Sequence, residues 1–250
     1  MGNKAVIEAC MLAGKIMLQS GAETHRVEDT MTRIAEAYGY NDIQSFAMPT
    51  GVHFSINKTE ASHFLRVSSR ATDLHKIADV NAISRDIANG KIPLHEAAKQ
   101  LKSVELSRQT FTKMTQVIAA ALVSGSFTIM FGGTWPDFLP SMITGGVAYA
   151  VMFWVVHLIG TRFIADFFAS IIIGLLAFLS ITIGFGNSLD KVIIGAVMPL
   201  VPGLPITNAV RDLLAGHLVA GVSKGVEAGL TAVAIGAGVA VMFGFVALFT

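Results

Sequence analysis

Charged residues are concentrated in the first half of this chain, and this asymmetry restricts its fold more than any other feature. Residues 1–116 contain 14 of the 18 Lys and Arg residues and 12 of the 17 Asp and Glu residues. The rest of the chain is almost entirely apolar, and the mean hydropathy of the whole is +0.62. Soluble domains carry about 25% charged residues, whereas this chain carries 14%. We therefore expect the first half to fold in water and the second in lipid.

The first half predicts an α+β domain over residues 1–113. Apolar residues at helical spacing predict a helix over residues 4–19, and Ser20-Gly21-Ala22-Glu23 matches the Ser-x-x-Glu capping box of a second helix. Alternating apolar residues then predict three strands. Two more helices follow them. The expected strands are 43–48, 52–56 and 63–67, and the expected helices are 73–89 and 93–103.

The second half, residues 114–250, predicts five membrane-spanning helices. Each apolar segment is close to the ~20 residues that cross the hydrocarbon core. The approximate spans are 114–133, 138–160, 163–184, 191–216 and 228–249. Lys113, Arg162 and Lys224 would all flank the same side of the membrane. The positive-inside rule then places the N-terminal domain in the cytoplasm and the C-terminus outside.

The fourth span is interrupted by Pro199, Pro202, Gly203 and Pro205. An unbroken helix does not tolerate this sequence, because each proline removes a backbone donor. Broken helices at membrane depth form substrate sites in many secondary transporters. We therefore expect the fourth span to be broken at Pro-Gly and to line such a site.

Three residues after the break complete the expected substrate site, which also includes Pro202 and Gly203. Asn208 lies in the first turn of the second half-helix, where free N–H groups attract a carboxylate. Arg211 and Asp212 follow it. A straight helix would place Arg211 near the inner interface, whereas a broken one would leave it within the membrane, and the sequence does not decide between them.

Two further groups of polar residues are candidates. Asp166 and Asp212 could carry a coupling proton, although Asp166 could equally form a simple ion pair with Arg162 four residues earlier. In the first half, a cytoplasmic-domain site would consist of the polar residues that follow the first helix. The alternative interpretation is that they only cap a helix and meet solvent. These residues are Ser20, Thr24, Arg26 and Glu28.

Several classes of function are not supported by the sequence. Basic and acidic residues are mixed, so we expect no nucleic-acid partner. The seven histidines have no metal-ligand spacing, and we expect neither a metal nor a cofactor. Cys10 is the sole cysteine, which excludes an intrachain disulfide, and we expect it in the core. Gly221, Gly225 and Gly229 form a smooth stripe that a helix of the same chain or another subunit could approach.

Two segments resemble the signatures of the bacterial threonine/serine exporter family. Residues 20–28 resemble the N-terminal signature, and Pro202-Gly203 followed by Arg211-Asp212-Leu213-Leu214 resembles the second. The resemblance implies a multi-pass protein of the bacterial inner membrane with a periplasmic C-terminus. Members of the family have about ten spans, so five spans imply its split form, in which a second small transmembrane subunit supplies the remainder. The split form is associated with succinate, and the family with threonine and serine.

The sequence thus favours a subunit of a secondary active exporter of small carboxylate-bearing metabolites. Its partners would be membrane lipid, the second small subunit and further copies in an oligomer. Two alternatives are a membrane-tethered hydrolase that uses Thr24, His25 and Glu28, and a regulatory or assembly subunit of a transporter. We expect no enzymatic activity, because neighbouring residues on a helix such as Thr24 and His25 do not face each other.

Overall fold

The computed structural model describes residues 3–57, 61–107 and 110–247. It divides into two compact units. The first comprises residues 1–110 together with 205–225, and the second comprises residues 111–204 together with 226–250. The expected boundary at residue 113 stays a prediction. The described residues are mostly helical and contain one three-stranded sheet.

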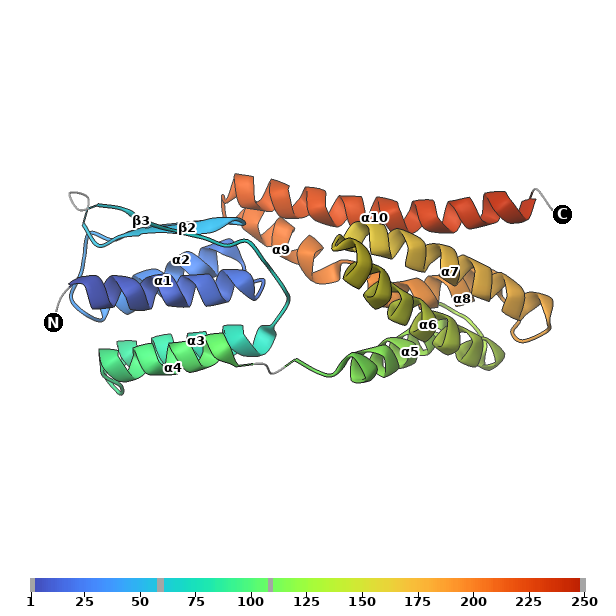
Figure 1. Cartoon of the computed structure of the whole chain (residues 1–250), viewed down its shortest axis with the longest axis horizontal. Coiled ribbons are helices and arrows are strands. Elements are labelled where there is room, and N and C mark those ends of the chain that lie inside the picture. Colours follow the sequence, from blue (N-terminus) through green and yellow to red (C-terminus); the bar gives the residue numbers. More distant parts are fainter. Residues whose placement is uncertain (1–2, 58–60, 108–109, 248–250) are drawn as a thin grey trace. The chain divides into compact units, whose positions relative to one another are not determined.

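The first unit contains three layers (Figure 1). Helices α1 and α2 form the middle layer, with an antiparallel sheet of order β1-β2-β3 on one side and helices α3 and α4 on the other. These elements are α1 (Asn3–Gln19), α2 (Thr24–Glu36), β1 (Gln44–Met48), β2 (Gly51–Ser55), β3 (His63–Arg66), α3 (Leu74–Ala88) and α4 (Leu94–Leu106).

The periodic residues of the first half are buried as their spacing predicts. Val27, Met31 and Ile34 line the inner face of α2 and are completely buried. Val52 and Phe54 point from β2 into the same core. Cys10 lies in this core as expected, and its burial raises the pKa of the thiol to about 12. Burial of such side chains stabilises a domain by about 1.5–3 kcal/mol each.

The expected capping box at Ser20-x-x-Glu23 is wrong. Helix α2 begins at Thr24, with Glu23 as its N-cap residue, and no side chain caps it. The segment instead terminates α1, because Gly21 has a φ of 82° and Ala22 N–H donates to the Met17 carbonyl. This is a helix C-terminus of the Schellman type, which requires the left-handed conformation that glycine adopts freely. A short sequence pattern does not distinguish the start of a helix from the end of the previous one.

Helices α5, α6, α7 and α8 lie in the second unit, with a 3-10 turn η1 after α8. Their bounds are α5 (Lys113–Met130), α6 (Trp135–Ile159), α7 (Arg162–Thr182), α8 (Leu189–Val197) and η1 (Met198–Leu200). Two further helices divide between the units, α9 (Gly203–Leu214) and α10 (Leu218–Ala247). Among the described residues, four helices are long and apolar enough to cross a membrane, and the interrupted pair α8–η1 and α9 would make five.

Small residues allow close helix packing within the second unit. A Cβ atom on Gly145 of α6 would lie 1.9 Å from the Ser124 hydroxyl of α5, and one on Gly195 of α8 would lie 1.9 Å from the Thr128 hydroxyl. Both hydroxyls donate to carbonyls one turn earlier in α5, so no polar group is left unsatisfied there. Close contact through small residues is typical of helices packed in lipid.

The start of the last helix differs from the expectation. Helix α10 begins at Leu218 rather than at residue 228, so Lys224 is helical and does not lie in a loop. Gly216, with a φ of 85°, ends α9 and allows the chain to reverse. Gly221 then packs against Leu213 and the Ala209 carbonyl of α9. This packing stabilises a glycine-rich segment whose intrinsic helix propensity is low.

Candidate functional site

The first unit places a short backbone turn, residues 20–24, beside the α9–α10 hairpin. This turn connects α1 to α2. The carbonyl of Gly21 accepts a hydrogen bond from the Asn208 amide at 2.9 Å, and the carbonyl of Ala22 accepts one from Lys224 Nζ at 3.2 Å. All of these atoms belong to the same compact unit. The two signature segments, almost 190 residues apart in sequence, therefore meet in one site.

A buried carboxylate, Asp212, lies at the centre of this site. It accepts hydrogen bonds from the Thr24 N–H at 2.8 Å, from the Thr24 hydroxyl at 2.9 Å and from Lys224 Nζ at 2.7 Å. Asp212 and Thr24 are completely buried, and Lys224 is 8% exposed. A buried ion pair is costly unless its remaining hydrogen-bonding capacity is satisfied. The N–H and hydroxyl groups of Thr24 supply these hydrogen bonds, so the cluster links α2 to α9 and α10.

An exposed cation lies beside the buried pair. The guanidinium of Arg211 contacts the carboxylate of Glu23. The Arg211 side chain is 62% exposed, whereas that of Glu23 is 8% exposed. His25 and Arg26 approach the other oxygen of Glu23 at 3.7 and 3.8 Å. A carboxylate of the protein thus sits among three basic side chains at the protein surface.

Glu28 extends the site one turn further along α2. Its carboxylate accepts the Ala47 N–H at 2.8 Å and lies 3.7 Å from His217 Nδ1. Burial raises the pKa of Glu28 above its ordinary value, opposed by the Ala47 hydrogen bond and by His217. Because the side chain is only 18% exposed, the neutral form is favoured by desolvation.

The structure brings together most residues of both expected sites. Thr24, Glu28, Asn208, Arg211 and Asp212 all belong to this cluster. The remaining ones lie at its edge or elsewhere. Arg26 is half-exposed and lies beside Glu23, Ser20 lies at the start of the turn and is buried, and Pro202 and Gly203 are grouped with the second unit.

Asp166 lies in the second unit and has a different environment. Its side chain is completely buried on α7, and Arg162 Nε is 3.7 Å from one carboxylate oxygen. Within the described part of the chain, neither carboxylate oxygen accepts a hydrogen bond. A buried carboxyl group without hydrogen bonds is uncommon and calls for an explanation.

Lys224 is the principal residue that the sequence interpretation missed as part of a site. It was interpreted only as a basic residue that orients the membrane spans. Its position between Gly221 and Gly225 offers a signal, because a helix approaches closely beside such glycines and a lysine there is forced against the neighbour. Glu23 and His217 were also not recognised, since their partners lie far away in sequence. Among residues 3–57, 61–107 and 110–247, no cluster of three or more His, Cys, Asp or Glu side chains could hold a metal ion.

Comparisons with known proteins show the family of the chain. The family model described as "Putative threonine/serine exporter" (ThrE) matches residues 8–246. The probable succinate transporter subunit YjjP of Klebsiella aerogenes is 25% identical over 94% of this chain and 92% of its own length. YjjP of Escherichia coli is 23% identical over 94% of this chain and 93% of its own length.

In a third relative, the match covers a smaller share of the relative's own length. The probable threonine/serine exporter of Mycobacterium tuberculosis is 20% identical over 88% of this chain, and the match spans 42% of that protein. No solved structure gives a significant match. The family model matches nearly the entire chain, and four helices of the described residues are apolar enough to span a membrane, with the bent pair as a fifth span. This protein is therefore a multi-pass membrane protein of the ThrE family of threonine/serine exporters.

Proposed function

We propose that this chain is the larger subunit of a secondary active exporter of small carboxylate-bearing metabolites. The candidate substrates are succinate or another dicarboxylate, and threonine or serine, which are named for its relatives. A second small transmembrane subunit would complete the transporter, because two relatives are named as transporter subunits. The N-terminal domain, residues 1–113, would lie in the cytoplasm and the C-terminus in the periplasm, with the protein in the bacterial inner membrane.

The observation that carries this proposal is the contact between Arg211 and Glu23. The helix that follows the Pro202-Gly203 interruption already holds a carboxylate, and the guanidinium that holds it is largely exposed. A guanidinium can bind a carboxylate through two parallel hydrogen bonds. A substrate carboxylate could therefore replace that of Glu23 on Arg211. In this conformation Glu23 occupies the place of the substrate.

Asn208 and the interruption before it would complete the substrate site. Helix α9 begins at Gly203, after two non-helical residues that follow η1, so Asn208 lies in its second turn and not in the first as expected. The first N–H groups of such a helix carry a partial positive charge that favours an anion. The Asn208 side-chain amide donates a hydrogen bond to the Gly21 carbonyl at 2.9 Å. Substrate binding that displaced Glu23 would thus act directly on the turn that Asn208 holds.

Two carboxyl groups are candidates for the coupling proton. Asp212 is neutralised by Lys224 and hydrogen-bonded by Thr24, which suits a structural lock between α2 and the hairpin. Asp166 accepts no hydrogen bond from the described residues, and Arg162 Nε lies 3.7 Å from it. An ionisable group inside a membrane helix is a functional candidate. Of the two, Asp166 is the better candidate.

The hydrolase alternative is not favoured by the comparisons or by the cluster. The Thr24 hydroxyl, its proposed nucleophile, is completely buried and donates to Asp212. A nucleophile must instead reach the substrate and be paired with a base. Thr24 is better explained as part of the lock around Asp212.

Export measurements in the native host test the proposal. The chromosomal copy is replaced by variants, so that any natural partner stays present, and efflux of labelled succinate, threonine and serine is followed. We expect Arg211→Ala to abolish efflux of one of these substrates and Arg211→Lys to retain part of it. Lys91→Ala, which removes an exposed cation paired with Asp86, is the matched control. Normal efflux by Arg211→Ala would remove Arg211 from the substrate site.

A further inference from the structure

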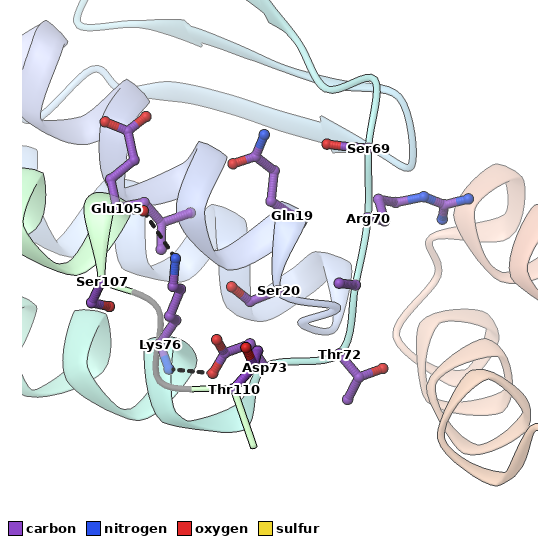
Figure 2. Close-up of a pocket in the computed structure, with 12 residues that line it drawn as sticks. Gln19, Ser20, Ser69, Arg70, Thr72, Asp73, Lys76, Glu105, Ser107 and Thr110 are labelled. Carbon is purple, nitrogen blue, oxygen red and sulfur yellow. Dashed lines mark hydrogen bonds between the residues drawn. The ribbon is translucent and has the colours of Figure 1, made fainter. Parts of the chain in front are cut away.

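The first unit contains a cavity of about 310 Å³ that is separate from the contacts of Arg211 and Asp212 (Figure 2). It lies between the end of α1, the segment leading into α3, and the end of α4. Figure 2 shows Lys76 reaching from Asp73 toward Glu105, with Gln19, Ser20, Ser69 and Arg70 on one side of it. The volume is at the lower end of the range for small-molecule sites, about 300–1,000 Å³.

The charge of Lys76 is not neutralised by the residues around it. Its Nζ donates to the backbone carbonyl of Glu105 at 2.9 Å, which is a neutral acceptor. The carboxylate of Glu105 is already bound by Lys15 at 2.7 Å and by Lys102, and these hydrogen bonds lower the pKa of Glu105. Asp73 uses one carboxylate oxygen to cap the Lys76 N–H at 3.1 Å. Among the described residues, Lys76 forms no ion pair.

The remainder of the lining is suited to a small polar anion. Ser20, Ser69 and Thr72 contribute hydroxyl groups, and Arg70 contributes a second cation. Hydroxyl groups can donate to or accept from a ligand, whereas an ammonium favours a carboxylate or phosphate. Two basic side chains, Lys76 and Arg70, thus line the cavity with two acidic ones, Asp73 and Glu105. Because the Glu105 carboxylate is bound by Lys15 and Lys102, the Lys76 ammonium and the hydroxyl groups are the groups left to hold a small anion.

The same cavity contacts the turn that holds the candidate functional site. The Ser20 carbonyl accepts the Asp73 N–H at 3.1 Å, and the Gln19 carbonyl accepts the Ala71 N–H at 2.8 Å. The next residues of the turn hold Asn208, Lys224 and Arg211. A ligand that ordered Ser20 would thus order a turn whose next four residues grip α9 and α10.

We propose that this cavity is a regulatory site for a small organic carboxylate, and that its occupancy is transmitted to α9 and α10 through residues 20–24. The ligand is held by the Lys76 ammonium and the surrounding hydroxyls. Its binding stabilises the turn in the conformation that joins Thr24 to Asp212. The proposal goes beyond substrate binding at Arg211, because it uses a different cation.

Binding to the purified full chain in detergent tests the site. Isothermal titration calorimetry is performed with succinate, L-threonine, L-serine and inorganic phosphate as probes. We expect a carboxylate probe to bind, with its affinity lowered at least roughly tenfold in Lys76→Gln. Lys91→Gln should bind that probe as the parent does. The binding that remains in Arg211→Gln, which lacks the cation of the proposed substrate site, should be weakened when Lys76→Gln is added. Circular dichroism verifies that each variant is folded.

Three outcomes would overturn the inference. They are the absence of binding by every carboxylate probe at millimolar concentration, binding of phosphate alone, and carboxylate binding that is lost in Arg211→Gln but not in Lys76→Gln. The last outcome would support the substrate site while rejecting the regulatory one, so the two proposals fail independently. Transmission is tested by hydrogen exchange at the Thr24 amide, which should slow when the probe is bound; unchanged exchange would reject the coupling.

Discussion

Replacing Asp212 by alanine should loosen the whole first unit, because it leaves the ammonium of Lys224 buried without a counter-ion. Asp212 is completely buried and the Lys224 side chain is 9% exposed, so solvent screens the pair little. Removing one partner of such a pair costs about 3–5 kcal/mol. The Thr24 N–H and hydroxyl also lose their acceptor, which places the expected cost within that range rather than below it.

The buried thiol of Cys10 provides the measurement. It is the sole cysteine of the chain, it is completely buried, and its raised pKa keeps it unreactive while the unit is closed. Labelling by a maleimide therefore requires opening of the unit, and its rate reports the free energy of opening. A loss of about 3 kcal/mol corresponds to a labelling rate at least about 100-fold faster in Asp212→Ala.

A double-mutant cycle separates the ion pair from general damage. Lys224→Met alone should also accelerate labelling, because it leaves the Asp212 carboxylate buried. The double variant Asp212→Ala with Lys224→Met should be less damaged than the sum of the single changes, since it contains no buried charge. Lys4→Ala, which removes an exposed pair with Glu8, should leave the rate unchanged. If Asp212→Ala labels at the parent rate, or the two single effects simply add, the assignment of the lock is wrong.

Three further predictions concern pH and packing, and the first two are read from apparent melting temperatures of the full chain in detergent. Burial raises the pKa of Glu28, so its contribution to stability is present below its unfolded pKa and is lost as the pH rises through its folded pKa. The melting temperature of Glu28→Gln should therefore rise relative to that of the parent across this pH interval. A difference in melting temperature that does not change with pH would contradict this. The pKa of Glu105 is lowered, so its contribution to stability is present above its unfolded pKa and is lost on acidification. Glu105→Gln should therefore melt at a lower temperature than the parent at neutral pH and at the same temperature in acid. An equal loss of melting temperature at both pH values would show that charge is not the cause. Gly221→Val should accelerate Cys10 labelling, because a Cβ there would lie 2.6 Å from Leu213, whereas Gly229→Val, where no described atom lies within 4 Å, should not; equal rates would refute the close packing of α9 on α10.

Local sequence patterns predicted most of the secondary structure of the first unit. Val27, Met31 and Ile34 recur at helical spacing and are buried on α2, because a helix that packs on a core must be apolar on one face. The three expected strands likewise appear as β1, β2 and β3. The errors occurred where a segment has two local interpretations. Ser20 to Glu23 ends one helix instead of capping the next, and the glycine-rich start of α10 is helical because it packs on α9.

The sequence singled out part of the residues in this cluster, but neither Lys224 nor the pairing of the segments. Arg211 and Asp212 were singled out because charges are rare in an apolar half, and Thr24 because it lies in a polar segment. Periodicity contains no information about which distant segment a helix face meets. The contact of Thr24 with Asp212 depends on closing a loop of 188 residues, and its free energy comes from packing rather than from either segment alone.

The sequence by itself determined that one half of the chain is rich in charge and the other is apolar, and hence that the protein needs both water and lipid. It also determined which faces of the helices are apolar, because side-chain spacing alone decides this. Only the tertiary structure decided that residues 205–225 pack in the charged unit, that Lys224 neutralises Asp212, and that the Glu23 carboxylate pairs with the Arg211 guanidinium. These contacts satisfy buried charges, and a buried charge finds its partner in three dimensions rather than along the chain.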